Sequence, residues 1–349
     1  VYADGIWENG GPPTLSDWSH LEVTQRIKRP ASATMTGEIE RYYEDRYLQR
    51  WSRPALAAML ASIPSVMMWD DHDIFDGWGS FPDEQQNCPV FKAVFAGAKR
   101  AFEAQQLRGA TQNRSRLDAR AAFTLRLTFG AYYLLVLDNR SERSQLQIMS
   151  DAHWAAVKTE LSALKTGRLL VMSGVPVVYR SFARIESLFG VTGDIADMED
   201  DILDHWSARP HQQERRKFIS ILLDTLAANA GCRAAILSGD VHVGGVGMIY
   251  DSARELEIYQ IISSGVVHPP PSLVQWLGIK ALTSDEKELL GNGDISTEML
   301  TADGAAEIIR DRNFARLHWG SDEKLWVNWE CEKEKIKPAF AIGPVLNPP

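Results

Sequence analysis

The sequence has few cysteines, no long hydrophobic run and no excess of positive charge. Three cysteines occur among 349 residues, and they are widely scattered (Cys88, Cys232 and Cys331). This pattern excludes a disulfide framework and a paired-cysteine metal knuckle, and it favours a reducing, cytoplasmic compartment. The longest apolar run, 169–179, already contains Ser, Gly and Pro and falls short of the roughly 18 residues that a transmembrane helix requires.

The charge balance and three missing motifs exclude further classes of protein. Lys and Arg total 37 against 46 Asp and Glu, which gives a net charge of −9. Non-specific binding to nucleic acid or anionic lipid needs a basic field, so we expect neither partner. The sequence also lacks a G-x-S-x-G elbow, a P-loop and a G-x-G-x-x-G fingerprint. These absences disfavour a serine hydrolase, a P-loop NTPase and a Rossmann-type dehydrogenase.

Helical and strand patterns alternate through the middle of the chain. Apolar residues make up 45% and charged residues 24%, as in ordinary globular proteins. Helical periodicity covers 37–60, 91–107, a segment that starts near 150 with Asp151 as its cap, and 211–228. Short apolar or alternating runs predict strands at 66–69, 123–129, 132–137, 169–172, 234–237 and 258–262. We therefore predict a layered α/β (or α+β) fold, with one domain over 1–349 that carries helical insertions.

Five of the predicted strands end abruptly in polar residues. These polar ends fall at 70–73, 138–140, 173–174, 238–242 and 263–265. Layered α/β proteins place their active sites at the carboxyl ends of sheet strands. The five ends therefore suggest a shared polar floor.

Three carboxylates surround one imidazole at residues 70–73, whose sequence is Asp-Asp-His-Asp. Like charges this close repel each other, so a folded protein tolerates them best near a cation or in solvent. Either one carboxylate binds a metal while another orients His72, or the segment is a solvated acidic turn. We favour the first interpretation because the motif follows an apolar strand and leads into the glycine-containing segment 77–80.

Asp240 and His242 form a second candidate ligand motif behind Gly239. In an extended segment, side chains two residues apart point the same way, so both would reach one metal or two adjacent metals. Taken alone, the pair is equally well explained as structural. Together with residues 70–73, it becomes a candidate dinuclear site with oxygen and imidazole ligands.

Arg140 and Arg143 follow the strand predicted at 132–137. The planar guanidinium of either residue is suited to clamping an anion, and an ion pair with an acidic residue is an equal alternative. His268 lies in a proline-rich loop behind the last predicted strand, and it either lines the site or is structural. We interpret the other histidines as structural or surface residues.

Together these motifs resemble the PhoD-like branch of the calcineurin-like metallophosphoesterases. The resemblance rests on residues 68–73, 137–143 and 237–242 and extends from residue 1 to about residue 268. It implies a four-layer α/β/β/α sandwich with a dinuclear metal centre at the strand ends. It also implies a phosphatase or phosphodiesterase that hydrolyses phosphate mono- or diesters. Because the chain starts like the end of a strand, we expect the N-terminal strands of the sandwich to be missing.

The resemblance assigns roles residue by residue. In the superfamily, an Asn-His-Asp/Glu motif supplies a metal ligand, the catalytic histidine and its orienting acid. Asp71, His72 and Asp73 fall on those positions, with Asp71 replacing the amide. A later Gly-His-x-His motif supplies two metal ligands and reads Gly-Asp-Val-His here, which assigns that role to Asp240 and His242.

Tyr2 falls where the related purple acid phosphatases have a tyrosine that binds iron. The implied cofactors are two divalent or trivalent metal ions, drawn from Fe, Ca, Zn and Mn. Two departures stand out. The Asp-x-His motif and the bridging acid of the family would lie before Val1, and Ser173 and Gly174 stand where many members have a histidine.

The implied reaction attacks the phosphorus of a small phosphorylated substrate with metal-activated hydroxide. His72 would donate a proton to the leaving oxygen while Asp73 holds its tautomer, and Arg140, Arg143 and His268 are candidates for substrate binding. A second hypothesis is a catalytically incomplete relative that acts as an anion-binding or interaction module. A third is a mononuclear hydrolase of a non-phosphate ester. PhoD-like relatives include exported proteins, whereas the cysteine pattern favours the cytoplasm.

Overall fold

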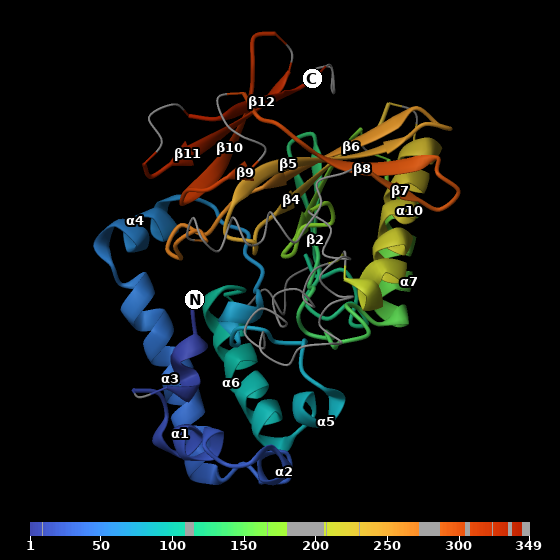
Figure 1. Cartoon of the computed structure of the whole chain (residues 1–349). Helices are drawn as coiled ribbons and strands as arrows, with labels where there is room; N and C mark the ends of the chain where they lie inside the picture. The colour runs from blue at the N-terminus through green and yellow to red at the C-terminus, as the bar shows by residue number, and fades with distance from the viewer. Residues whose placement is uncertain are drawn as a thin grey trace. The chain divides into compact units, whose positions relative to one another are not determined.

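The computed structural model describes residues 1–8, 10–108, 115–165, 167–179, 206, 208–229, 231–271, 287–303, 308–322, 324–333 and 337–343. They form a mixed α/β fold with two compact units (Figure 1). The helical unit comprises Val1–Arg116 and Arg140–Ile148, and the sheet unit comprises Leu117–Asn139 and Met149–Pro349. The single domain expected over 1–349 stays a prediction.

The described helices of the helical unit include one predicted helix that is divided in two at Pro54. They are α1 (Pro13–Ser19), α2 (Val23–Arg26), α3 (Ala33–Trp51), α4 (Pro54–Ser62), α5 (Asp83–Gln86) and α6 (Pro89–Gln105). The helix predicted over 91–107 is confirmed by α6. The helix predicted over 37–60 is divided into α3 and α4, because Pro54 has no N–H to donate and disfavours helical backbone in the residue before it.

Helices α3 and α6 pack directly against each other (Figure 1). The side chains of Ile39 and Tyr43 are fully buried on α3, and Gly97 faces them from α6. A Cβ atom on Gly97 would lie 2.6 Å from Cγ2 of Ile39, which is closer than carbon atoms approach each other. The glycine therefore permits the close approach of the two helices.

Tyrosines of α3 anchor two loops of the helical unit. The hydroxyl of Tyr42 donates a hydrogen bond to the carbonyl of Ala3 at 3.0 Å, and the hydroxyl of Tyr43 donates to the carbonyl of Ile74. Burial raises the pKa of Tyr43 well above its usual value of 10.0, so this hydroxyl keeps its proton and remains a donor. Helix α3 thereby fixes both the first residues of the chain and the segment that follows residue 70.

The strand predicted at 66–69 is not formed. Residues 64–69 have no regular secondary structure, although Ile63 and Asp70 on either side have extended backbone angles. An apolar run becomes a strand only when a neighbouring strand pairs with its backbone. No strand among the described residues pairs with this segment.

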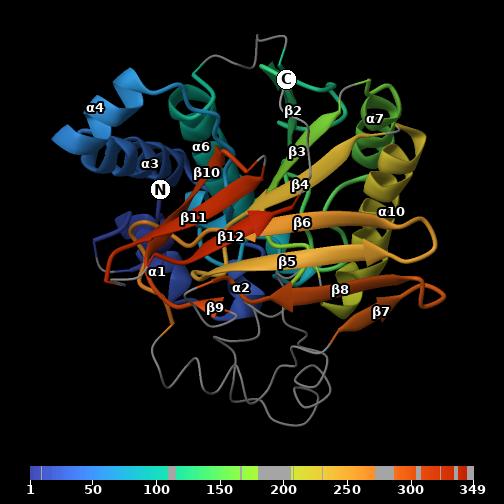
Figure 2. The ribbon, with the colours of Figure 1, turned by 90° about the horizontal axis from the view of Figure 1, so that it is seen from above.

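A nine-stranded sheet dominates the sheet unit (Figure 2). Its strand order is β1-β2-β3-β4-β6-β5-β8-β7, and β9 pairs with β5. The strands are β1 (Leu125–Phe129), β2 (Tyr132–Val136), β3 (Arg168–Ser173), β4 (Arg233–Ser238), β5 (Gly244–Asp251), β6 (Leu256–Ile262), β7 (Glu288–Leu290), β8 (Ile295–Leu300) and β9 (Ile308–Ile309). The strands predicted at 123–129, 132–137, 169–172, 234–237 and 258–262 are confirmed by β1 to β4 and β6.

Strands β2, β3, β4 and β6 are parallel neighbours. Their registers align Val136 with Met172, Met172 with Leu237, and Leu237 with Ile261. The polar segments that follow these strands, 138–140, 173–174, 238–242 and 263–265, therefore begin at one edge of the sheet. The shared polar edge is confirmed for these four strand ends, whereas residues 70–73 belong to the helical unit.

Helices and a second sheet add further layers to the sheet unit. Helices α7 (Asp151–Ser162) and α10 (Gln212–Ala228) pack against each other, and α10 also packs on β4 and β6. A three-stranded sheet of β10 (Asn313–Trp319), β11 (Leu325–Cys331) and β12 (Ala339–Ile342) lies on the opposite face (Figures 1 and 2). The cap of α7 is Ser150 rather than the predicted Asp151, because the Ser150 hydroxyl accepts from the N–H of His153 at 3.2 Å.

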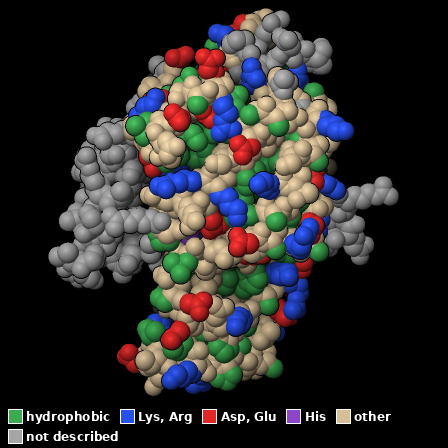
Figure 3. Space-filling view, turned by 90° about the vertical axis from the view of Figure 1, so that its right-hand side faces the viewer, with side chains coloured by type: hydrophobic (Ala, Val, Ile, Leu, Met, Phe, Trp, Pro, Cys, Tyr) green, Lys and Arg blue, Asp and Glu red, His purple; other side chains and the backbone are tan. Residues whose placement is uncertain are grey.

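The surface agrees with the charge balance of the sequence. Acidic and basic side chains are interspersed over the described residues on the face drawn in Figure 3. Within the described part of the chain, every helix is too short or too polar to cross a membrane. The structure thus contains no membrane span in the residues that it describes.

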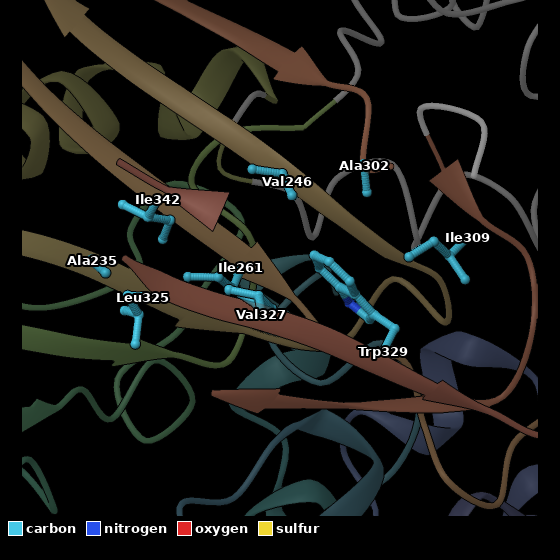
Figure 4. Close-up of a cluster of buried hydrophobic side chains, with 9 residues drawn as sticks. All are labelled: Ala235, Val246, Ile261, Ala302, Ile309, Leu325, Val327, Trp329 and Ile342. Atoms are coloured by element: carbon cyan, nitrogen blue, oxygen red, sulfur yellow. The ribbon is translucent and has the colours of Figure 1, made fainter. Parts of the chain in front are cut away.

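The hydrophobic cluster between the two sheets centres on Trp329 (Figure 4). Its side chain comes from β11, is fully buried and lies among Val246, Ile261 and Ile309. The indole N–H donates a hydrogen bond to the carbonyl of Ile262 at 2.8 Å. Trp329 therefore joins the three-stranded sheet to β5 and β6 through both packing and a buried polar contact.

Replacing Trp329 with Ala should lower the free energy of unfolding by about 3–5 kcal/mol, because the change opens a large cavity and leaves a carbonyl unsatisfied. Urea denaturation followed by circular dichroism measures this loss. The matched control is Phe314→Ala on β10, where the side chain is 51% exposed and the expected change is within about 0.5 kcal/mol. Equal losses in the two variants would show that Trp329 is not the centre of this core.

Candidate functional site

The acidic segment forms a tight turn in the helical unit. Residues Asp71–Asp73 make one turn of 3-10 helix, and Asp70 caps it. The capping is reciprocal, since the N–H of Asp70 donates to Oδ2 of Asp73 at 3.0 Å. Gln106 also donates to Oδ1 of Asp73 at 3.0 Å. Asp73 therefore holds the turn in place, and its predicted role as the orienting acid stays a prediction.

The carboxylate that contacts the ring of His72 is Asp4. Nδ1 of His72 lies 2.9 Å from Oδ1 of Asp4 and 3.9 Å from Oδ1 of Asp76. The ring of Tyr2 lies against the same imidazole, with 4.6 Å between the ring centroids. Sequence reasoning missed Asp4, because it stands 68 residues before His72 and belongs to no recognisable motif.

The surroundings of His72 favour its protonated form. Burial alone lowers the pKa of His72, but the hydrogen bond with Asp4 and the negative charges of Asp71, Asp4 and Asp76 outweigh it. Together they raise the pKa from 6.5 to about 10. The imidazole is thus a proton donor that is held close to three carboxylates.

Arg140 compensates the negative charge of the acidic turn. Its side chain is fully buried, its Nε donates to Asp70, and its Nη2 lies 3.4 Å from Oδ1 of Asp71. The indole N–H of Trp78 donates to the carbonyl of Arg140 at 3.2 Å and fixes its backbone. Of the two alternatives for Arg140, the ion pair with acidic residues is present in the structure.

Arg143 is 4% exposed and packs against Gly79 in the same unit. Gly79 has a φ of +102°, and a Cβ atom there would lie 2.5 Å from Cγ of Arg143. Only glycine satisfies both conditions, because other residues avoid this backbone region and have no space. The loop at 77–80 therefore closes over the stem of Arg143.

Asp71, His72 and Asp76 each offer one ligand atom, and these atoms lie within 4.8 Å of one another. Asp71 is 5% exposed and also accepts from the N–H of Gly77 at 3.1 Å, so its carboxylate is held in a fixed position. Carboxylate oxygens and imidazole nitrogens are suitable ligands for Fe, Zn and Mn. The two carboxylates of this group therefore fit a metal ion of the kind that the sequence implies, whereas His72 could coordinate an ion only after losing its proton.

The second candidate motif lies at the carboxyl end of β4 in the sheet unit. Asp240 and His242 have φ angles of +70° and +56°, which place both in the left-handed region. The N–H of Val241 donates to the carbonyl of Gly239 at 2.9 Å. The prediction of an extended segment at Asp240 and His242 is therefore wrong, because the chain turns sharply directly after β4.

His242 and His268 come together in the sheet unit. Their rings stack with 3.9 Å between centroids and 26° between planes. Nδ1 of His268 lies 2.9 Å from the carbonyl of Pro269. His268 is thus next to one of the predicted ligands, while its role in substrate binding stays a prediction.

Replacing Asp4 with Asn should lower the pKa of His72 by more than one unit, because it removes the negative charge that accepts from Nδ1. Proton NMR of the chelator-treated protein measures this pKa from the shift of the ring protons. The wild-type midpoint should lie near 10, compared with 6.5 for an ordinary histidine.

The raised pKa of His72 also makes the free energy of unfolding depend on pH. A pKa that is raised on folding stabilises the protein fully below pH 6.5, and this contribution is lost as the pH rises towards 10. Asp4→Asn should flatten this dependence of the free energy of unfolding on pH. A wild-type midpoint close to 6.5 would contradict the geometry described for His72.

Comparison with known proteins gives three similarities. The sequence model of the family described as PhoD related phosphatase matches residues 1–192 and 184–309. The chain is 28% identical over 360 residues to the uncharacterized protein YGR266W of Saccharomyces cerevisiae, and the match covers 78% of this chain and 50% of that protein. A solved structure titled "Structure of PhoD" aligns with a TM-score of 0.57 and 15% identity, and it covers 92% of this chain and 59% of that chain.

These similarities differ in what they establish. The structural alignment establishes a shared fold, and the present chain spans about half the length of the yeast relative. The family model extends through both candidate motifs, from the first residues past His268. With most of its length matched in this way, the chain belongs to the PhoD related phosphatase family.

Proposed function

We propose that this protein hydrolyses phosphate mono- or diesters at a dinuclear metal centre. The observation that carries the proposal is the buried carboxylate of Asp71 close to His72 and Asp76, in a chain of the PhoD related phosphatase family. In this group Asp71 is the candidate metal ligand and His72 is the candidate proton donor. The chain spans 50% of the length of the yeast protein and 59% of the aligned PhoD structure, so the activity of either whole protein is for this chain a proposal.

In this proposal, Asp71, Asp240, His242 and Tyr2 hold two divalent or trivalent ions. The ions, when bound, make a nucleophile available from water at neutral pH and neutralise charge on the phosphoryl oxygens. Fe, Zn, Mn and Ca all accept oxygen ligands, and the imidazole of His242 favours the transition metals among them. Asp71 and Tyr2 are the proposed ligands of the helical unit, and Asp240 and His242 are those of the sheet unit.

His72 would act as the general acid. Its pKa of about 10 keeps the imidazole protonated at neutral pH, and Nδ1 is occupied by Asp4. The proton that it donates to the leaving oxygen would therefore come from Nε2. Asp4 orients the ring directly, and Asp73 supports the same turn through its capping contacts with Asp70.

The substrate phosphate would be bound by Arg143, Arg140 and His268. A buried guanidinium interacts strongly with phosphate because little water screens its charge. Arg143 is 4% exposed, and Arg140 already balances Asp70 and Asp71. We therefore assign direct phosphate contact to Arg143 and charge balance mainly to Arg140.

We further propose that the helices, the nine-stranded sheet and the three-stranded sheet of the sheet unit are three layers of an α/β/β/α sandwich. The stacking of α10, the large sheet and β10 to β12 supports this architecture. The whole chain then acts as one catalytic domain.

Replacing His72 with Ala should lower kcat for a phosphate ester by about 10² or more, because the leaving oxygen loses its proton donor. The assay uses p-nitrophenyl phosphate and bis-p-nitrophenyl phosphate, with Mn²⁺, Zn²⁺, Fe³⁺ or Ca²⁺ supplied in turn. His318→Ala is the matched control, since His318 lies exposed on β10 and should leave kcat unchanged.

The same assay separates the competing functions. Unchanged turnover in His72→Ala would remove this residue from the mechanism. Phosphate binding by the wild type without turnover on either ester would favour an anion-binding module. One metal per chain, together with hydrolysis of a carboxylic ester alone, would favour a mononuclear hydrolase.

A further inference from the structure

The loop that carries Asp240 and His242 has a strained backbone. Both residues have positive φ angles, +70° and +56°, and neither is glycine. Residues with side chains adopt this conformation only where surrounding contacts impose it. The contacts that hold the start of this loop therefore determine where the two side chains point.

Those contacts lead from the loop to Asn139 through the end of β3. The N–H of Gly239 donates to the carbonyl of Gly174 at 3.0 Å. The N–H of Gly174 in turn donates to Oδ1 of Asn139 at 3.1 Å. The side-chain oxygen of Asn139 is thus connected, through the backbone of Gly174, to the residue that precedes Asp240.

Asn139 is well suited to hold this position. Its side chain is 1% exposed at the end of β2, and the hydroxyl of Ser173 donates to the same Oδ1 at 3.1 Å. Oδ1 of Asn139 therefore accepts two hydrogen bonds, one from the hydroxyl of Ser173 at the end of β3 and one from the N–H of Gly174 in the loop that follows. An apolar side chain would remove the acceptor of the partly buried N–H of Gly174, whereas Ser173 would keep its second acceptor, the carbonyl of Val175 at 2.7 Å.

We propose that Asn139 is a positioning residue that presents Asp240 and His242 to the metal centre. The inference rests on the proposed function, which assigns these two residues as ligands. Partners of this kind orient ligands before the ion arrives, and their loss typically weakens metal binding by about 10- to 100-fold. Asn139 itself contacts neither the ion nor the substrate in this assignment.

The test measures the affinity of the whole chain for Mn²⁺ by isothermal titration calorimetry. Asn139→Leu keeps the size of the side chain and removes its oxygen, so the dissociation constant should rise by about 10- to 100-fold. Hydrogen exchange of the amides at 239–243 in the chelator-treated protein should become faster in the same variant. Asn139→Ser, a milder change that also removes Oδ1, serves if the leucine variant does not fold.

The matched control is Ser173→Ala, which removes the other donor to Oδ1 and keeps the N–H of Gly174 in place. It should lower thermal stability to a similar extent while the dissociation constant for Mn²⁺ stays within about threefold of wild type. If Asn139→Leu and Asn139→Ser both bind Mn²⁺ with wild-type affinity, the inference about Asn139 is wrong, while the proposed function is unaffected. The same conclusion follows if Ser173→Ala weakens Mn²⁺ binding as much as Asn139→Leu does. A wild-type chain that binds no Mn²⁺ would overturn the proposed function and this inference together.

Discussion

The parallel pairing of β2, β3, β4 and β6 is the constraint on which the sheet unit depends. Parallel neighbouring strands run in the same direction, so the polar residues that follow them lie at the same edge of the sheet. Asn139, Gly174 and Gly239 follow three successive strands of this edge and are joined by hydrogen bonds. The left-handed turn at Asp240 is built on this rigid support, which explains how a strained loop persists.

In the helical unit the main constraint is electrostatic, because negative charge is concentrated at residues 70–76. The four carboxylates in these seven residues would repel one another. The positive charges of the buried Arg140 and of the protonated His72 reduce this repulsion. Tyrosines of α3 hold the segments on which Asp4 and the acidic turn lie, because their buried hydroxyls donate to main-chain carbonyls. An acidic turn held in this way is pre-organised to receive a cation at small additional cost.

The sequence predicted five strands of the large sheet, because the alternation of apolar residues is a local property. Ligand chemistry is also local, and it indicated the candidate site residues, whose roles stay predictions. The strands β1 to β4 and β6 followed from apolar runs, and Asp71, His72, Asp240 and His242 followed from motifs. Features that depend on distant partners were missed. Asp4 contacts His72 across 68 positions, residues 66–69 lack a neighbouring strand, and the positive φ angles at Asp240 and His242 arise from the turn after β4. The contacts of Asn139 likewise depend on distant partners, because Ser173 and Gly174 lie 34 and 35 residues away in sequence.

The proposed function requires that Asp71 in the acidic turn and His242 after β4 each bind a metal ion. Anomalous diffraction from crystals grown with Mn²⁺ tests it most directly. We expect anomalous peaks from Mn²⁺ beside the carboxylate of Asp71 and beside the ring of His242. Anomalous peaks bound by residues of one motif alone, or no peak at either motif, would contradict the account.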